Sequence, residues 1–374
     1  MQKRKLKICL ICDVQSIHFK RWIRDLKDLG HDVSVISPYP DESGSIDVAL
    51  VSTPKAPFPM FQFIKTFLKM VYRIWLSLNM RGKIKEISPD VLHSHFLTTS
   101  GWIGAWTGFH PFIVTIHGSD ILVQPKESLI YRLGNWCVLK KADRIVGVAE
   151  HLKDHLTKSI AIQKKYNYIP NYVDPEFIIQ KSRIASKQRD ILVQPVIISA
   201  RALDPIYDIN TLIKSIPNLL EAFPDSKIMI IGDGEKAASL KQMAVDLGVA
   251  DHIEFIGKVL HSDLIKYFQL GHIYVSTALS DGLSVTTLEG MASGLFPILT
   301  DIPANRSVVT DKKNGLLFPK GNSQRLTECI IHAINNQSAL SHVCEMNLDM
   351  IQAQYSRSKV LGAMEKVYYD VIEK

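Results

Sequence analysis

The chain has 374 residues, a hydrophobic content of 46% and a formal net charge of +7 at neutral pH. This length allows two domains with separate cores, and the composition excludes a disordered or fibrous protein. The apolar runs are too short to span a membrane, and the basic residues are too dispersed for a nucleic-acid-binding arm. We therefore expect a globular protein whose basic charge serves a small phosphorylated ligand, a lipid surface, or both.

The cysteines and the N-terminus give no sign of a disulfide framework or a secretion signal. Five cysteines are scattered along the chain, and an odd number suits a reducing compartment. Cys9 and Cys12 lie in the strand-like run KICLIC, which favours buried thiols over a redox or zinc pair. The basic start MQKRKLK precedes an apolar run too short for a signal peptide, so a cytoplasmic location is predicted.

The first half of the chain alternates short apolar runs with helical stretches. The strand KICLIC is followed by a helical pattern, IHFKRWIRDLKDL, that closes at Gly30. Further strands are predicted at DVSVIS, DVLHSH, FIVTIH and DRIVGV, with a long helix near 61–86. Continuous β-branched strands separated by helices indicate a parallel sheet that is covered on both faces.

The same pattern restarts after the polar stretch 181–190. Strands are predicted at VIISA, KIMII, HIEFIG, HIYVS, FPILT and GLLF, with helices between them. We predict an α/β protein with two Rossmann-like domains, residues 1–178 and 190–355, that face an interdomain cleft across a hinge near 175–192. A C-terminal helix at 356–374 can pack back on the N-terminal domain. Ligands of such folds bind beyond the carboxyl ends of the strands.

The stretch SDGLSVTTLEGMASG (280–294) follows the predicted strand HIYVS and carries two acids eight positions apart. Gly282 frees the backbone, and a helix is expected from about Ser284. The N–H groups at the start of this helix, those of Leu283, Ser284, Val285 and Thr286, would form an anion site supported by the helix dipole.

The two acids of this stretch suit neutral hydroxyl groups. Asp281 could accept hydrogen bonds from a sugar, and Glu289 from a ribose. The plainer alternative is that Asp281 or Ser284 caps the helix and that Glu289 is a solvated helix residue.

Other polar residues also follow predicted strands. Arg201 follows VIISA and can neutralise a diphosphate, while His117 follows FIVTI in the run HGSD. The turn IIGDGE places Gly232, Asp233 and Gly234 where a backbone can approach a nucleobase or sugar closely. Each has an ordinary alternative: a surface arginine, a core or capping histidine, and a common turn. The run HSH (93–95) offers only two histidines, so no metal site is predicted.

The order of these motifs is similar to that of the large retaining glycosyltransferase family 4, which has the GT-B fold. The resemblance runs through nearly the whole chain: SIHFKRW, PDVLHSH, TIHGSD, ADRIVGVAE, IPNYVD, IIGDGE, SDGLSVTTLEGMASGLFPILTDIPANRSVV and NGLLF. The long block is the most specific. The family pattern of a Glu, seven residues and a second Glu reads here as Asp281, seven residues and Glu289.

The resemblance implies a role for each matching residue. Glu289 would bind the donor ribose, Asp281 the transferred sugar, and Arg201 the diphosphate; His117 would lie beside the sugar. The implied catalytic residues are His117, Arg201, Asp281 and Glu289. The implied donor-binding residues are Tyr207, Gly232, Asp233, Gly234, Lys258, Gly282, Leu283, Ser284, Val285, Thr286 and Glu289. The implied acceptor-side residues are Ser16, His18, His95 and Asp120.

Three positions depart from the family pattern. Asp281 is one methylene shorter than the usual Glu, and Tyr207 stands where the family has a lysine. Lys258, after FIG, is the candidate to replace that lost charge. The run DVQSIH (13–18) stands in place of a pair of glycines. We interpret these differences as variation that affects the choice of donor and the rate.

The resemblance implies transfer of a sugar from a nucleoside diphosphate to a hydroxyl acceptor, with retention of configuration and without a metal or other cofactor. A UDP-sugar is the favoured donor, with a GDP-sugar as the alternative. The expected acceptor is a lipid-linked intermediate of a surface polysaccharide, lipopolysaccharide or glycolipid. Two other functions remain open: a nucleotide-sugar epimerase with the same architecture, and a degenerate, non-catalytic binding subunit.

The segment 59–87 has helical spacing, several aromatic residues and six basic residues before its first acid, Glu86. A basic amphipathic helix can lie on an anionic membrane, which would make the protein peripheral to the inner face of the cytoplasmic membrane. The alternative is an ordinary helix that covers the sheet and exposes its basic side.

Overall fold

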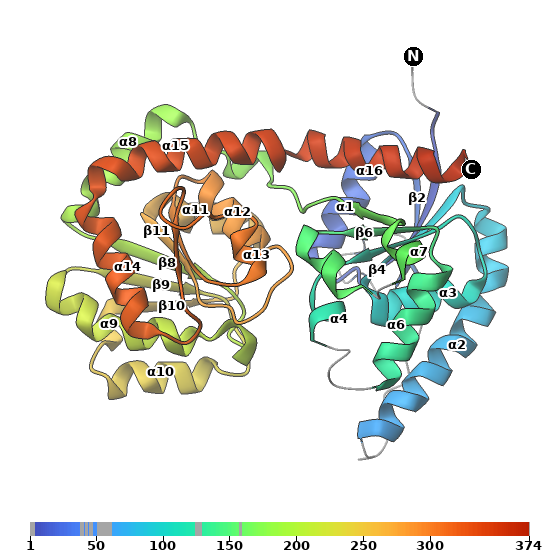
Figure 1. Ribbon diagram of the computed structural model, residues 1–374, viewed down its shortest axis with the longest axis horizontal. Helices are drawn as coiled ribbons and strands as arrows, with labels where there is room; N and C mark the ends of the chain where they lie inside the picture. Colours follow the sequence, from blue (N-terminus) through green and yellow to red (C-terminus); the bar gives the residue numbers. More distant parts are fainter. Residues whose placement is uncertain are drawn as a thin grey trace. The chain divides into compact units, whose positions relative to one another are not determined.

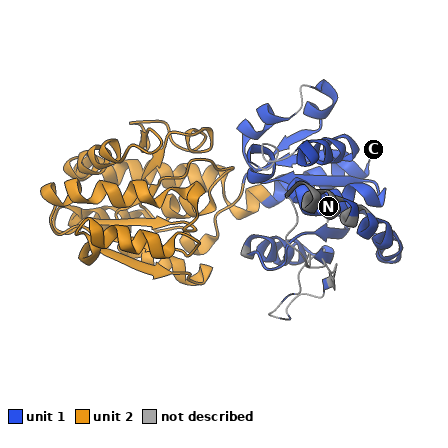
Figure 2. Ribbon diagram, turned by 90° about the horizontal axis from the view of Figure 1, so that it is seen from below, with its two compact units in different colours: residues 1–170, 361–374 blue, residues 171–360 orange. Residues whose placement is uncertain are grey.

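The computed structural model describes residues 4–37, 41, 44, 48–50, 62–123, 129–156 and 159–373. The chain divides into two compact units, residues 1–170 with 361–374 and residues 171–360 (Figure 2). The predicted boundaries at 178 and 190 therefore both fall inside the second unit. The predicted cleft between two domains stays a prediction.

The first unit is built on one parallel sheet in the order β3-β2-β1-β4-β5-β6-β7. Its strands are β1 (Lys7–Ile11), β2 (Asp32–Ser37), β3 (Val48–Leu50), β4 (Val91–His95), β5 (Phe112–Ile116), β6 (Arg144–Gly147) and β7 (Tyr166–Tyr168). Every residue of β4 and β5 is buried, as expected for central strands covered on both faces.

The helices of the first unit cover both faces of this sheet (Figure 1). They are α1 (Ile17–Asp28), α2 (Gln62–Ile87), α3 (Trp102–Thr107), α4 (Ser119–Leu122), α6 (Leu129–Lys141), α7 (Ile160–Gln163) and most of α16 (Arg357–Ile372). Helices α2, α3 and α6 pack against one another. Helix α16 is tied to the unit by a hydrogen bond between the Tyr368 hydroxyl and His93 Nδ1, and by one that the Glu365 carboxylate accepts from His31 Nε2.

The second unit repeats the strand order of the Rossmann fold: β10-β9-β8-β11-β12-β13. Its strands are β8 (Val196–Ala200), β9 (Lys227–Ile231), β10 (Ile253–Gly257), β11 (Ile273–Ser276), β12 (Phe296–Thr300) and β13 (Leu316–Phe318). Helices α9 (Ile209–Ala222), α10 (Ala237–Asp246) and α14 (Ser323–Asn335) form one layer; α8 (Lys181–Arg189), α11 (His261–Leu270), α12 (Val285–Ala292) and α15 (Gln337–Gln354) form the other (Figure 1).

Most strands lie where the sequence predicts them, with three differences in the elements. The short strands β3 and β7 were not predicted. The polar stretch 181–190, interpreted as part of a hinge, is mostly helix α8. This helix is fixed by two buried side chains, Ile184 and Gln188, and the Gln188 amide donates hydrogen bonds to the carbonyls of His272 and Gly294.

Two smaller expectations can also be compared with the structure. Cys9 and Cys12 are free and buried, and burial raises the pKa of the Cys9 thiol to about 12, which confirms the prediction of buried thiols. Among the described helices, none combines the length and the hydropathy needed to cross a bilayer.

Candidate active site

The polar residues of the second unit gather where its strand order reverses. Strand β8 leads into Arg201, and the neighbouring strand β11 leads into the loop that ends at Ser284. These two strands mark the topological switch point, where α/β sheets bind ligands beyond the carboxyl ends of the strands. The positions of the predicted donor residues therefore follow from the fold.

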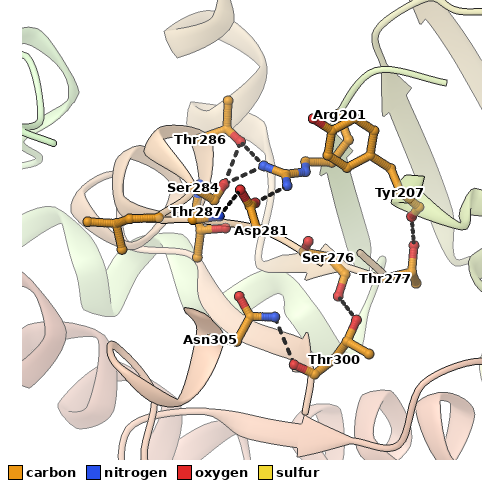
Figure 3. A network of polar contacts seen from close by, with 12 residues as sticks. Arg201, Tyr207, Ser276, Thr277, Asp281, Ser284, Thr286, Thr287, Thr300 and Asn305 are labelled. Carbon is orange, nitrogen blue, oxygen red and sulfur yellow. Dashed lines mark hydrogen bonds and ion pairs between the residues drawn. The ribbon is translucent and has the colours of Figure 1, made fainter. Parts of the chain in front are cut away.

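Arg201 is the centre of a hydrogen-bonded cluster (Figure 3). Its NH2 group pairs with the carboxylate of Asp281, and its NH1 group donates to Ser284 Oγ at 2.5 Å. Thr286 Oγ1 lies 3.1 Å from Ser284 Oγ and 3.0 Å from the hydroxyl of Tyr274. Arg201 and Asp281 were predicted to have separate roles, and their direct pairing was not predicted.

The surroundings of Arg201 keep it charged. Its side chain is only 8% exposed, and burial alone would lower the pKa of a guanidinium. The Asp281 carboxylate, together with the oxygens of Tyr274 and Tyr207, outweighs that effect and raises the pKa. The Nε atom of Arg201 is buried and has no hydrogen-bond partner in the part of the chain that the structure describes. The guanidinium is thus charged, while one of its N–H donors is unsatisfied among the described residues.

The start of α12 supplies further donors. Ser284 is the N-cap residue, and its Oγ accepts the N–H of Thr287 at 3.1 Å. The capping alternative is therefore confirmed for Ser284. Capping leaves the N–H groups of Val285 and Thr286 without partners inside the helix, so the same turn can also bind an anion.

Tyr207 occupies the position of the family's lysine and contacts Arg201 through its aromatic ring. Its ring lies beneath the guanidinium, with 4.5 Å between the Arg201 Cζ atom and the ring centroid. Its backbone carbonyl accepts a hydrogen bond from Thr277 Oγ1 (Figure 3). A cation–π contact of this kind orients the arginine but adds no charge for a diphosphate.

Glu289 is fully buried, so the alternative of a solvated helix residue is wrong. Its Oε1 atom lies 2.7 Å from His261 Nε2, and the other ring nitrogen of His261 lies 3.7 Å from Asp174 Oδ2. Neither His261 nor Asp174 was predicted as a site residue. Asp174 ends the run IPNYVD, which was used only as part of the resemblance, and His261 lies in a segment without a distinctive motif. The three residues offer ligand atoms within 4.8 Å of one another and could hold a metal ion.

The turn after β9 packs against the loop that carries Arg201. A Cβ atom on Gly232, which has a φ of +140°, would lie 2.0 Å from the Arg201 carbonyl oxygen; on Gly234 it would lie 2.6 Å from Asp204 Oδ1. These glycines therefore allow the close approach of the two loops. Asp233 is exposed. Lys258 is also exposed, and the hydrogen bonds of the Arg201 cluster, as far as the described residues show, do not include it.

In the first unit a stack of histidines lies beyond the carboxyl ends of β4 and β5, one strand away from the switch point between β1 and β4. His95 ends β4 and His117 follows β5, and their rings meet through a 3.2 Å contact between Nδ1 and Nε2. The Phe19 ring packs against both. His93 lies beside His95, and its two ring nitrogens are hydrogen-bonded to the hydroxyl groups of Tyr368 and Thr115.

These histidines are held neutral. Burial lowers the pKa of His93 to about 3, and the nearby His117 adds to the effect. Burial also lowers the pKa values of His95 and His117 well below the usual range, each with a contribution from a neighbouring histidine.

The remaining acceptor-side residues have different environments. The Asp120 carboxylate is fully buried and accepts the N–H groups of Leu97 and Gly118, at 3.0 and 2.9 Å, and that of His117. It therefore shapes the loop that carries His117. His18 is exposed on α1 near His117, and Ser16 precedes that helix.

Two parallel sheets of Rossmann type, with polar clusters beyond the carboxyl ends of their strands, define the class of GT-B enzymes. Family comparisons give the identity within that class. Residues 15–177 match the model described as Glycosyltransferase Family 4, and residues 180–357 match Glycosyl transferases group 1. The chain belongs to this family of glycosyltransferases. This result favours a transferase over the epimerase and the non-catalytic subunit.

Individual relatives resemble the chain over most of its length. An uncharacterized glycosyltransferase of Methanocaldococcus jannaschii is 24% identical, over 95% of this chain and 94% of the relative. The alpha-monoglucosyldiacylglycerol synthase of Acholeplasma laidlawii is 22% identical, over 93% and 91%. The structure of Anabaena HepE with UDP and glucose superimposes with a TM-score of 0.76 and 15% identity, over 98% and 99% of the two chains.

Proposed function

We propose that the protein transfers a sugar from a UDP-sugar to a hydroxyl acceptor with retention of anomeric configuration. The observation that carries this proposal is the buried, charged Arg201, whose Nε atom has no hydrogen-bond partner among the described residues, beside the N-terminus of α12. Both features suit the β-phosphate of a nucleoside diphosphate. A similar fold binds UDP and glucose in Anabaena HepE, which supports UDP over GDP.

The proposed catalytic task is to stabilise the departing diphosphate. Negative charge grows on this group as the sugar leaves, and preorganised donors in a water-poor site lower the barrier. Arg201 and the first N–H groups of α12 supply these donors. Asp281 orients Arg201 and accepts a hydrogen bond from a hydroxyl of the transferred sugar. Glu289 accepts hydrogen bonds from the ribose hydroxyls. His117 lies beside the sugar. The cluster contains no placed nucleophile, so we favour transfer on one face of the sugar over a covalent intermediate.

Metal independence is part of the proposal, because a guanidinium can neutralise a diphosphate without a cation. The group of Asp174, His261 and Glu289 makes a direct test necessary. Turnover should be unchanged in excess EDTA and should not rise on addition of Mg²⁺ or Mn²⁺. A loss in EDTA that a divalent cation restores would contradict metal independence without contradicting sugar transfer.

We assign the acceptor to the first unit, with Ser16, His18 and His95 on its acceptor side. A lipid or lipid-linked acceptor is favoured, since the similar Acholeplasma enzyme is named as a glucosyldiacylglycerol synthase. The predicted membrane segment 59–87 forms helix α2 from Gln62 onward. Residues 59–61 lie outside the described residues, as do the side chains of Lys65, Lys69 and Arg73.

The deciding experiment incubates the protein with UDP-glucose, UDP-galactose, UDP-N-acetylglucosamine or a GDP-sugar, and with lipid or polysaccharide acceptor extracts. Sugar transfer with release of UDP, and an α-linked product in NMR spectra, would agree with the proposal. An isomerised sugar nucleotide without acceptor glycosylation would identify an epimerase. A product with inverted configuration would contradict retention.

A further inference from the structure

Helix α6 of the first unit exposes a row of apolar side chains. Leu129, Leu133 and Trp136 are 67%, 65% and 39% exposed. Their spacing of four and three residues places them on one side of the helix, and Lys140 continues the same row. The opposite side of α6 is ordinary core, with Gly134 and Val138 buried. A helix that is apolar on both sides needs a second partner besides its own sheet.

Helix α2 packs against α6 (Figure 1). It exposes a second apolar row with the same spacing. Val71, Trp75 and Leu78 are between 45% and 57% exposed. Arg81 and Lys85 continue this row and are exposed as well. Both helices therefore carry an apolar row that ends in basic residues. We call these two rows together the α2–α6 face.

The charges on this face select its partner. Helix α6 contains no acid, and three of its residues, Arg132, Lys140 and Lys141, are exposed and basic. The Lys140 ammonium lies 3.9 Å from the centroid of the Trp136 ring. Tryptophan with lysine at the edge of an apolar row is typical of the interface of a bilayer, where the ring enters and the amine reaches the phosphates.

We propose that the α2–α6 face docks on an anionic membrane. Trp75, Leu78, Leu133 and Trp136 enter the interfacial region, and Lys85 and Lys140 contact lipid phosphates. The docking surface includes α6 as well as α2, the helix that the sequence predicts to bind a membrane. The inference rests on the proposed lipid or lipid-linked acceptor. Apolar burial and charge attraction act together in such binding, so it should weaken in salt.

The test is co-flotation with phosphatidylcholine vesicles, with and without one-third phosphatidylglycerol. The wild-type protein should float with the anionic vesicles only. Leu133→Glu should lower the bound fraction by about tenfold or more, because a leucine is lost from the interface and an acid is added. Val245→Glu, at a 60% exposed position on α10, is the matched control and should float normally.

Other outcomes would overturn the docking. These are equal flotation of Leu133→Glu and wild type, absence of wild-type flotation, or a concentration-dependent dimer that Leu133→Glu abolishes, which would assign the face to a second copy. Thermal unfolding shows whether Leu133→Glu is folded, and Trp136→Ala is the substitute if it is not. UDP binding by the same variants separates this test from failure of sugar transfer.

The second unit carries an independent feature: His261 holds the Glu289 carboxylate. The imidazole lies between Glu289, at 2.7 Å, and Asp174, at 3.7 Å, and Phe177 packs on the ring with 5.1 Å between the centroids. Asp174 and Phe177 belong to the segment that opens this unit. These contacts with the ring nitrogens and the ring face fix the orientation of the imidazole. The Glu289 carboxylate that it bonds is therefore held in one orientation.

The geometry points to His261 as a positioning residue for the nucleotide, acting through Glu289. This inference rests on the proposed contact of Glu289 with ribose hydroxyls. His261→Phe keeps the ring stack and removes the hydrogen bond, so the KM for the UDP-sugar should rise about tenfold with little change in kcat. His261→Gln, which can still donate, should recover part of the loss.

A UDP analogue without ribose hydroxyls distinguishes this positioning role from a structural one. If His261 acts through the ribose contact, His261→Phe should weaken the binding of UDP but have little effect on the binding of 2′,3′-dideoxy-UDP. Equal losses for both ligands, or no loss for either, would overturn the positioning role. His252→Phe is the matched control, since His252 is a half-buried histidine of the same unit that bonds only the Ser226 carbonyl among the described residues. If Glu289→Ala also leaves UDP binding unchanged, the proposed ribose contact itself fails.

Discussion

Both units place polar residues beyond the carboxyl ends of parallel strands, one strand apart in the same strand order, and the two groups differ in chemistry. In the second unit the loops after β8 and β11 bring together a permanent cation and a carboxylate, Arg201 and Asp281. In the first unit the ends of β4 and β5 carry His95 and His117, which burial keeps neutral. The Arg201 cluster is therefore suited to an anion and the histidine cluster to an uncharged group, such as a sugar hydroxyl.

The largest expected effect comes from removing the cation. Arg201→Ala should lower turnover at least a hundredfold, because one preorganised donor to a developing anion contributes about 3 kcal/mol. Arg325→Ala removes an exposed arginine of the same unit, paired with Glu328, and should leave turnover unchanged. Comparable turnover in wild type and Arg201→Ala would remove the distinction between the Arg201 cluster and the histidine cluster.

Removing Glu289 should act mainly on donor affinity. A hydrogen bond to a charged group contributes roughly 1.5–3 kcal/mol, so Glu289→Ala should lower the affinity for UDP by about tenfold to a hundredfold. Titration calorimetry gives the affinity, and Glu254→Ala, at an exposed position of β10, is the control. An unchanged dissociation constant would show that the buried carboxylate has a structural role only.

The neutral histidines predict that the first unit is the more sensitive to acid. In the unfolded chain a histidine has a pKa near 6.5, so below that pH the unfolded state binds protons that folded His93, His95 and His117 do not. The free energy of unfolding should therefore fall as the pH falls from 7.5 to 5. In the second unit burial lowers the pKa of one histidine, His272, to about 4.

Tryptophan fluorescence isolates this effect, because all five tryptophans belong to the first unit. The urea midpoint from fluorescence should fall further between pH 7.5 and 5 than the midpoint from far-ultraviolet circular dichroism. His95→Gln removes one titrating group and should reduce the fall. Parallel falls for both probes would argue against the comparison.

The smallest effect should come from Tyr207. Its ring face orients Arg201, so Tyr207→Phe should retain nearly full turnover, whereas Tyr207→Ala should lose about tenfold or less. Tyr207→Lys introduces the family's residue and tests whether extra charge compensates for the lost ring. Equal turnover for Tyr207→Ala and Tyr207→Phe would show that the ring contact is not used.

The sequence predicted the sheets better than the side-chain partners. Buried parallel strands such as VIISA and FIVTI are continuous apolar runs, which sequence patterns detect directly. Strands β3 and β7 have only three residues each, which is too short for a pattern. Helix α8 has a polar composition, and only tertiary contacts of Ile184 and Gln188 explain its place in the fold.

The candidate site shows the same limit. Arg201, Asp281 and Glu289 could be found because each lies in or beside a recognisable motif at a strand end. His261 could not, because its contact with Glu289 joins two helices 28 residues apart in the sequence. The pairing of Arg201 with Asp281 spans 80 residues and also requires the folded sheet. Motifs therefore identified the groups, but not the partners that orient them.

The most direct test of the central claim is titration calorimetry of UDP against wild type, Arg201→Ala and Arg325→Ala. We expect UDP to bind wild type and Arg325→Ala equally, and Arg201→Ala at least tenfold more weakly, because the diphosphate loses its buried cation. Uridine should bind all three proteins alike, since it carries no phosphate. Equal UDP affinity in wild type and Arg201→Ala would contradict the assignment of this cluster as a diphosphate site.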